Sequence, residues 1–558
     1  MNQDRARRPL LLGLAVAVAV AVIAGGALAL RLVLPGTSAP TAAGPVPRFA
    51  DEAASSGLNF KYDGPFTYAL GGGVALFDCD DDGLPEVYLA GGEGPAALFG
   101  NDSEIGGPLR FTRLAAAETD LTAVIGAYPI DIDGDGVTDL VTLRYGENVV
   151  LRGLGGCRFE RANEAWGLNG GAALTEAFSA TWEGDAHWPT IAFGNFADPE
   201  SDDFETWCQP NVLVRPADEG SGQGFGPPIE LMPSFCTQSM LFSDWDGSGR
   251  KDLRVSNDRA YYPADVGEEQ LWRITPGEAP HLYGVDDGWV RVQVEGMGIA
   301  AHDVTGDGLP EIYLTSQNAN KLQALAAAGA GTVQPSYRDI GLRYGVNVAQ
   351  PFTGPDTSLP STAWHPEFDD VNNDGFIDLF VSKGNVTSQP DFALRDPSNL
   401  LLGGPDGTFR EAADTAGILN FERGRGAVLA DLNLDGKLDI ILANYQAPVR
   451  VWRNTSQDLG GWLAVRLSQP EPNVDAIGAV VEVRLGDAVD RRELVVGGGH
   501  AGGELGWIAF GLGPNDTAEI RVTWPGSGPG EWHRVDANQH VVIDHSVGEP
   551  RPWPGEGE

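Results

Sequence analysis

An aspartate-rich pattern of nine residues occurs six times between Asp78 and Asp439, and it constrains the fold more than any other feature. Each copy has oxygen-bearing side chains at positions 1, 3, 5 and 9, and glycine at position 6. Short apolar or small-residue runs lie on both sides of each copy, as is typical of β-strands. The pattern therefore predicts repeated strand–loop–strand hairpins. The copies are DCDDDGLPE from Asp78, DIDGDGVTD from Asp131, DWDGSGRKD from Asp244, DVTGDGLPE from Asp303, DVNNDGFID from Asp370 and DLNLDGKLD from Asp431.

The spacing of the oxygen atoms in these loops suits calcium. Ca²⁺ takes six to eight oxygen ligands, and alternate residues of a tight loop can point at one centre. Glycine at position 6 lets the backbone turn, and the acid at position 9 closes the cage from the next strand. The sequence predicts up to six Ca²⁺ sites. Their ligands are Asp78, Asp80, Asp82 and Glu86; Asp131, Asp133, Asp135 and Asp139; Asp244, Asp246, Ser248 and Asp252; Asp303, Thr305, Asp307 and Glu311; Asp370, Asn372, Asp374 and Asp378; and Asp431, Asn433, Asp435 and Asp439.

An EF-hand is the obvious alternative for such loops, and the sequence argues against it. That loop needs a bidentate Glu at position 12 and a helix on each side. Position 12 is instead occupied by residues such as Leu89, Thr142 and Leu442, and the flanks are β-type runs. Each loop is therefore expected to connect two strands of a hairpin.

The spacing of the loops predicts seven repeat units. Successive loops begin 53, 113, 59, 67 and 61 residues apart, so one interval is about twice the others. Residues 180–196 in the long interval keep the strand–turn–strand outline, with Glu183-Gly184-Asp185 in place of the acidic cage. About 60 residues per unit suits one four-stranded blade of a propeller. We therefore expect a seven-bladed β-propeller in which the third blade has lost its metal.

A second repeat indicates how the ring closes. The stretches 159–168, 337–346 and 409–418 share an aromatic residue followed by Gly at +8 and an aliphatic residue at +9, and 111–121 is a variant. They have the position of the last strand of a blade. A further copy, FADEAASSGL (49–58), precedes the first loop, whereas none follows the last. The N-terminal segment is thus expected to supply the outer strand of the seventh blade, which removes an exposed sheet edge.

These loops resemble the FG-GAP/VCBS repeats of integrin-α-like propellers. Residues 460–545, with GWLAVRL, NVDAIGAVVEVRLG, VTWPG and ANQHVVI, resemble the ASPIC/UnbV domain of cartilage-acidic-protein-like proteins. The segment GGGHAGGELGW (497–507) departs from that family, which is more polar there. The resemblance, together with strand-like alternation, implies an all-β chain: a seven-bladed β-propeller over 48–455, a small β-sandwich-like domain over 460–545 and a disordered tail at 546–558.

The N-terminus predicts export. Three arginines precede an apolar run from Leu10 to Leu30, long enough to span a bilayer, while Ala27-Leu28-Ala29 also fits a cleavage site. Residues 1–34 are interpreted as a signal peptide or signal anchor, and 35–47 as a linker. The protein is expected outside the cytoplasm, either anchored by this helix or, if it is cleaved, secreted or periplasmic. Contact with the membrane is expected through this segment only.

Charge and cysteine content limit the partners. The net charge of −41 argues against nucleic acid and anionic membrane surfaces. Cys208 and Cys236 are candidates for a disulfide in an exported chain, while Cys79 and Cys157 either pair or stay free.

Two functions fit the sequence. The first is an exported, membrane-proximal, calcium-binding propeller that acts as a binding, adhesion or assembly scaffold. Its partner would be an unknown protein or carbohydrate ligand in the envelope or outside the cell, with Ca²⁺ mainly structural. The alternative is a carbohydrate-active enzyme, a polysaccharide lyase or hydrolase, on the same propeller. The sequence has no GxSxG, HExxH, phosphate-binding loop or dinucleotide fingerprint, so no catalytic residue is predicted and an enzyme is not expected.

Overall fold

The computed structural model describes residues 44–198, 207–217, 224–259, 266–326, 333–348, 359–386 and 392–556. The predicted export segment 1–34 and most of the linker lie outside these residues. Within the described ranges, no helix has the length and apolar character needed to cross a membrane.

Seven antiparallel units of four strands, here called blades, are present in the described residues. In blades 1 to 6 the strands follow one another in sequence order, and the sheet of blade 1 has a fifth, parallel strand at its edge. Blades 1 to 3 are β2 (Val74–Phe77), β3 (Glu86–Leu89), β4 (Ala97–Asn101) and β5 (Phe111–Leu114); β6 (Val124–Ile130), β7 (Asp139–Arg144), β8 (Val149–Gly153) and β9 (Phe159–Arg161); and β10 (Thr175–Thr181), β11 (Thr190–Asn195), β12 (Asn211–Val214) and β13 (Ile229–Leu231). Blades 4 to 6 are β14 (Thr237–Ser243), β15 (Asp252–Asn257), β16 (Gln270–Arg273) and β17 (His281–Leu282); β18 (Gly296–His302), β19 (Glu311–Ser316), β20 (Lys321–Leu325) and β21 (Tyr337–Asp339); and β22 (Ala363–Asp369), β23 (Asp378–Lys383), β24 (Asn399–Leu402) and β25 (Arg410–Glu411). Blade 7 is β26 (Arg423–Ala430), β27 (Asp439–Tyr445) and β28 (Ala447–Asn454) with β1 (Phe49–Asp51).

The first strands of the blades form a closed ring. Each contacts the first strand of the next blade, and β26 contacts β2. They are also almost wholly buried, so blade-to-blade packing supplies most of the core. This arrangement confirms the all-β, propeller-like prediction.

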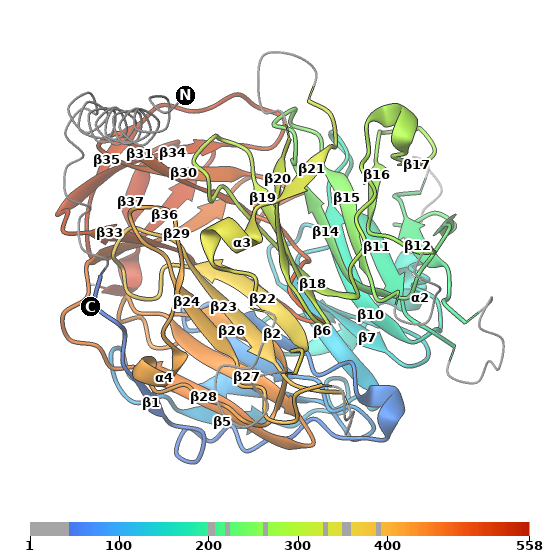
Figure 1. Ribbon diagram of the computed structural model, residues 1–558, viewed down its shortest axis with the longest axis horizontal. Helices are drawn as coiled ribbons and strands as arrows, with labels where there is room; N and C mark the ends of the chain where they lie inside the picture. Colours follow the sequence, from blue (N-terminus) through green and yellow to red (C-terminus); the bar gives the residue numbers. More distant parts are fainter. Residues whose placement is uncertain are drawn as a thin grey trace, which may run out of the picture. The chain divides into compact units, whose positions relative to one another are not determined.

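The N-terminal strand closes blade 7, as predicted. β1 pairs with β28, with Phe49 opposite Asn454 and Asp51 opposite Trp452, and Figure 1 shows the two side by side. Arg453 Nε donates to Glu52 Oε1 at 2.8 Å, which adds an ion pair to the strand pairing. The two ends of the ring are therefore joined within one sheet.

The two sequence repeats take the positions expected of them. All six aspartate loops connect the first and second strands of their blades, and residues 181–190 do so in blade 3. The second repeat supplies last strands, and three of its copies continue into single-turn helices. These are α2 (Asn163–Trp166), α3 (Gly341–Tyr344) and α4 (Ala413–Ala416), while the short 3₁₀ turns are η1 (Phe66–Tyr68), η2 (Val285–Asp287) and η3 (Pro554–Glu556).

The C-terminal residues form a sandwich of two four-stranded sheets around an apolar core that includes Leu463, Val481 and Phe510. One sheet has β33 (Ile508–Gly513), β29 (Gly461–Ser468), β36 (Gln539–Asp544) and β37 (Pro550–Pro552), and the other has β31 (Ala488–Glu493), β30 (Val480–Leu485), β34 (Thr517–Thr523) and β35 (His533–Asp536). The prediction of a disordered tail at 546–558 was wrong for the described residues. β37 pairs with β36, and the ring centroids of Trp553 and Trp507 lie 5.6 Å apart. Strand pairing and aromatic packing therefore order this segment.

Residues 496–505, here called the central segment, leave the sandwich and enter the middle of the ring. Its strand β32 (Gly503–Leu505) runs parallel to β2. The backbone of the rest of the segment also bonds to the first strands of blades 2 to 5. Representative contacts are Ala127 N to Ala501 O at 3.1 Å, Ala180 N to Val496 O at 3.1 Å, Gly498 N to Met240 O at 2.6 Å and Gly499 N to Ile299 O at 2.7 Å.

Glycines make this insertion sterically possible. A Cβ at Gly73 or Gly126, on or beside the first strands of blades 1 and 2, would lie 1.8 Å from Ala501 O. Real Cβ contacts are never so short, so side chains at these positions would displace the segment. The glycine-rich stretch that departs from the family pattern is thus the part of the sandwich domain buried in the ring.

Both pairs of cysteines form disulfides, which settles the alternatives left open by the sequence. Cys79 of the first loop bonds to Cys157 in blade 2. Cys208 of blade 3 bonds to Cys236, which precedes β14 of blade 4. Each disulfide therefore links two neighbouring blades.

Candidate functional site

The aspartate loops share one internal hydrogen-bond pattern. In the second loop, Asp131 Oδ2 accepts from Gly136 N at 2.9 Å and Asp135 Oδ1 accepts from Val137 N at 3.0 Å. The glycine at position 6 has a left-handed backbone, with φ of 82° at Gly136, as the sequence argument required. The first acid accepts from the position-6 amide in all six loops.

The closing acids at position 9 are the most deeply buried. Asp139 is fully buried and accepts from Ile132 N and Gly153 N, both at 2.8 Å. Burial raises the pKa of Glu86 to about 8, with nearby Asp80 and Asp78 adding to the rise. Burial likewise raises the pKa of Glu311 to about 7 and holds that of Asp139 well above its usual range. The described residues around these carboxyl groups supply too little positive charge to favour the ionised form, which a bound cation would favour.

The loops fit calcium by their geometry and by their unpaired oxygens. Carboxylate oxygens of Asp78, Asp80 and Glu86, and of Asp131, Asp133 and Asp139, converge to within 4.8 Å in each group. The other loops do not bring three acidic groups this close in the described part of the chain. Four of the six loops nevertheless have a buried side-chain oxygen without a hydrogen-bond partner in the described residues: Asp133 Oδ1, Asp244 Oδ1, Asp303 Oδ1 and Asn433 Oδ1. A hard cation bound by oxygen would satisfy such atoms.

The aspartate loop of blade 4, which begins at Asp244 and is here called the fourth loop after its blade, already contains a cation of its own. Arg250 Nε and Nη2 donate to the two oxygens of the predicted ligand Asp252, at 2.8 and 3.0 Å. Trp245 Nε1 and Tyr283 Oη also donate to Asp252 Oδ2, each at 2.9 Å. The closing acid of this loop is thus neutralised and saturated by protein groups.

Blade 3, where the sequence predicted no metal, uses an arginine in a similar way. Arg215 Nε and Nη2 contact the two oxygens of Glu183 at 2.6 and 3.0 Å, and Thr190 Oγ1 donates to Glu183 Oε1. The guanidinium also donates to Thr275 O in blade 4 at 3.0 Å. Arg215 therefore connects the decayed loop to the neighbouring blade.

The sandwich lies against the loops. Arg466 Nη2 contacts Asp78 Oδ2 at 3.1 Å, and Arg491 Nη1 contacts Asp303 Oδ2 at 3.1 Å. Asp244 N donates to Glu493 of the sandwich, and Gly513 N donates to Asn373 O in the loop of blade 6 at 3.0 Å. The first acids of several loops thus lie at the interface between propeller and sandwich, whereas other predicted ligands, such as Asp80, Asp135 and Asp307, are exposed.

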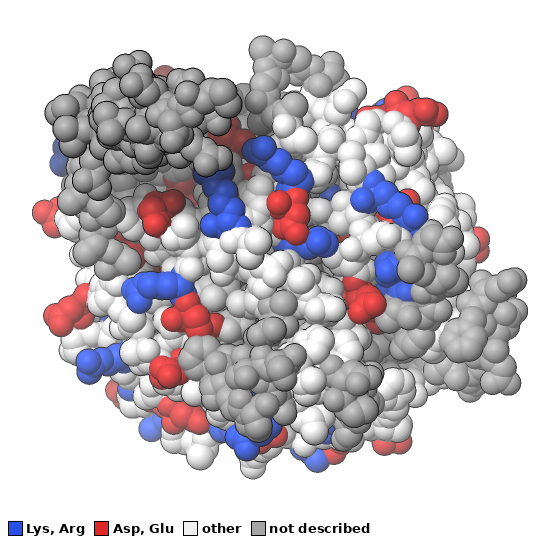
Figure 2. All heavy atoms as spheres, in the orientation of Figure 1, with Lys and Arg blue, Asp and Glu red and all other residues white. Residues whose placement is uncertain are grey.

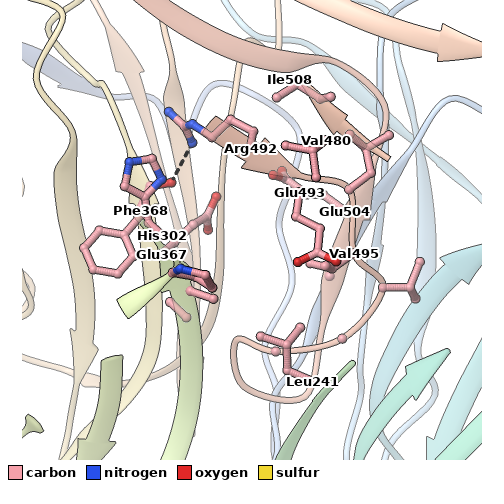
Figure 3. A pocket seen from close by; sticks show the side chains of 18 of the residues that line it. Leu241, His302, Glu367, Phe368, Val480, Arg492, Glu493, Val495, Glu504 and Ile508 are labelled. Atoms are coloured by element: carbon pink, nitrogen blue, oxygen red, sulfur yellow. Dashed lines mark hydrogen bonds between the residues drawn. The ribbon is translucent and has the colours of Figure 1, made fainter. Parts of the chain in front are cut away.

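A cavity of about 520 Å³ lies at this interface around the central segment. Its walls combine apolar side chains, among them Leu241, Val480, Val495 and Ile508, with acidic and basic groups (Figure 3). The polar wall contains His302 of β18, Glu367 and Asp369 of β22, Arg492 of β31 and Glu504 of β32.

Glu367 is held in position by two donors. Leu429 N donates to Glu367 Oε1 at 3.2 Å, and His365 Nε2 lies 3.0 Å from Glu367 Oε2. Since His500 N donates to His365 Nδ1 at 3.1 Å, the ring proton is on Nε2 and points at Glu367. Burial lowers the pKa of His365 to about 3, so this ring is neutral.

Sequence reasoning did not predict this wall. Glu367, Arg492 and Glu504 belong to no motif, and only the insertion of the central segment brings them together. His302 and His365 are both buried beside them.

Comparison with known proteins supports the same division of the chain. Residues 78–142 and 370–442 match the FG-GAP-like repeat, and residues 469–550 match the family described as ASPIC and UnbV. The chain combines these two kinds of unit. This confirms the resemblance deduced from the aspartate loops and the C-terminal stretches.

The chain is also similar in sequence to curated proteins, over different shares of its length. The chain is 24% identical over 495 residues to Cartilage acidic protein 1 of Homo sapiens, which covers 81% of this chain and 68% of the human protein. It is 26% identical over 246 residues to Cartilage acidic protein 1 of Mus musculus, covering 43% of this chain and 35% of the mouse protein. Among solved structures, BBS1N in complex with ARL6DN is similar at 8% identity, with a TM-score of 0.41, over 75% of this chain and 99% of that chain.

Proposed function

We propose that this protein is an exported, membrane-proximal scaffold that binds a protein or carbohydrate ligand, and that Ca²⁺ in its aspartate loops is mainly structural. The observation that supports this role is the position of the sandwich, which contacts four of the loops directly. Ions in such loops would stabilise the propeller and the seat of the sandwich.

Two further observations favour this proposal. The two disulfides suit an oxidising compartment, in agreement with the predicted export segment. On the face drawn in Figure 2, acidic and basic side chains are interspersed, so this face has no broad field of one sign. Such a surface suits recognition by shape and local contacts more than the capture of polyanions. The proposal includes no catalytic step.

Calcium removal tests the proposal. Each site occupied at about 100 times its dissociation constant adds about 2.7 kcal/mol, so several sites together should change the melting temperature greatly. We expect bound calcium in the purified protein, a lower melting temperature in EDTA, and proteolysis near residues 455–460 that EDTA accelerates. Magnesium at the same concentration is the control, because it accommodates such loops poorly. A protein without calcium, or a melting curve unchanged by EDTA, would refute the structural role.

A further inference from the structure

The cavity between propeller and sandwich has more negative charge than its own walls neutralise. Each arginine that lines it is already paired within the protein. Arg491 contacts Asp303 and Glu482, Arg492 contacts Asp369 and Asp490, and Arg521 contacts Glu482. Two acids of the wall, Glu367 and Glu504, form no salt bridge with a lysine or arginine of the described residues, although Arg492 acts on both from a longer distance. The neutral ring of His365 contacts Glu367.

Glu504 is directed into this space by the strand that carries it. Glu504 and its neighbours Gly503 and Leu505 in β32 all line the cavity, and Figure 3 shows Glu504 among the side chains of its wall. No described residue forms a hydrogen bond or ion pair with its carboxylate. Glu504 is accessible to solvent from the cavity even though protein surrounds it. Burial, Glu367 and Asp369 together hold the pKa of Glu504 well above its usual range.

His302 adds a polar group to the same wall. Its side chain is only 5% exposed, and its Nε2 lies 3.4 Å from Asp490 Oδ1. Its Nδ1 has no hydrogen bond to any described residue, so this ring offers a hydrogen-bonding group to a molecule in the cavity.

The geometry favours an organic cation over a metal ion. Ligand atoms of one ion must lie within about 5 Å of one another, because each is bonded at about 2.0–2.6 Å. The acidic groups that converge this closely in the described ranges do not include His302, Glu367 or Glu504. A cavity of about 520 Å³ lies within the size of small-molecule sites, which are commonly 300–1,000 Å³. Its apolar walls suit an aliphatic body between charged ends.

We propose that this cavity binds a small organic cation, an amine or guanidine on an aliphatic body, through the carboxylates of Glu367 and Glu504. This assignment goes beyond the proposed scaffold function and adds a small-molecule ligand to it. The charged head would form ion pairs with the two carboxylates, and Leu241, Val495 and Ile508 would pack against the aliphatic part.

Calorimetric titration of the full-length protein in calcium with agmatine tests the proposal. Agmatine carries a guanidinium and an ammonium group on an aliphatic chain, while pentanol and pentanoate serve as neutral and anionic controls. We expect agmatine alone to bind, and Glu504→Gln to weaken binding by about tenfold or more. Glu367→Gln should also weaken it. Glu519→Gln, which changes an exposed acid of the sandwich outside the cavity, should bind agmatine like the parent protein.

A second readout separates a binding role from a structural one. Without ligand, Glu504→Gln should melt at the same or a higher temperature, because it removes a carboxylate repelled by Glu367 and Asp369. Weaker binding with undiminished stability supports the site. Absence of agmatine binding, equal binding by Glu504→Gln, or equal binding of pentanol would overturn it. Calcium content and the response of the melting temperature to EDTA are measured on the same samples. If the protein contains calcium and is destabilised by EDTA but does not bind agmatine, the cavity proposal alone is refuted.

Discussion

Glu176 is an ionisable side chain buried near the centre of the ring without hydrogen-bond partners among the described residues. It lies at the bulge of β10, is fully buried, and neither of its carboxylate oxygens has a hydrogen-bond partner in the described residues. Burial raises its pKa to about 8, although Arg425 partly opposes the rise. The folded protein therefore keeps a proton on Glu176 at pH values where the unfolded chain has lost it.

This difference predicts a pH dependence of stability. Below the unfolded pKa of about 4.5 the group is neutral in both states, and between there and about 8 the free energy of unfolding should fall as pH rises. The slope from this one group is about 1.4 kcal/mol per pH unit. Glu176→Gln should remove that slope and be the more stable protein at pH 8. Melting curves of both proteins from pH 5 to 8 measure this, and parallel curves would contradict it.

Residue identities predicted the loops well but the cavity poorly. The spacing of the acids and the position-6 glycine follow from local chemistry. The place of Asp131 at the start of its loop and the left-handed turn at Gly136 could therefore be predicted without a structure. The fourth loop shows where this reasoning stops. Arg250 at position 7 looks like a solvated loop residue, and only the fold shows that it binds Asp252. Glu367 and Glu504, 137 positions apart, meet through tertiary packing that leaves no local signature.

At the scale of single elements, the loops of blades 3 and 4 offer a matched comparison. Removing Arg215 or Arg250 leaves a buried carboxylate without its cation, which should cost about 3 kcal/mol in EDTA. The fourth loop keeps Asp244, Asp246 and Ser248, so calcium can replace the lost charge of Arg250→Gln. The decayed loop of blade 3 lacks such a set, so calcium should not rescue Arg215→Gln.

Thermal melting in EDTA and in calcium measures this difference. For Arg250→Gln, the difference in melting temperature between variant and parent protein should be smaller in calcium than in EDTA. This variant should also bind one more calcium ion per chain than the parent protein. For Arg215→Gln, the difference should remain. Equal responses of the two variants would show that the fourth loop does not retain a latent calcium site.

Strand order was also predictable at this scale, for a physical reason. The repeats recur at nearly constant spacing, and each blade must bury both faces against its neighbours, so a decayed copy such as residues 180–196 still forms β10 and β11. The C-terminal tail was predicted less well. Its Pro/Gly-rich composition suggested disorder, but β36 offers an open edge to which β37 adds.

For the whole molecule, closure of the ring depends on β1. Deleting residues 48–60 exposes the edge of β28 and removes the ion pair between Glu52 and Arg453. We expect a large fall in melting temperature together with aggregation, because an open β edge templates association. Calorimetry with light scattering measures both. Deletion of residues 36–43, which precede the strand, is the control, and if the two deletions melt alike, β1 is not the latch of the ring.

The central segment also imposes an order on events in the life of the chain. The ring draws its first strands from residues 74–430, its closing strand from residues 49–51 and the filling of its middle from residues 496–505. During synthesis, the blades must therefore wait for a piece of the chain that follows all of them. A truncated product that ends after blade 7 would have every blade but an unfilled centre. Cellular quality control could thus distinguish such a product from the longer chain by one short glycine-rich stretch.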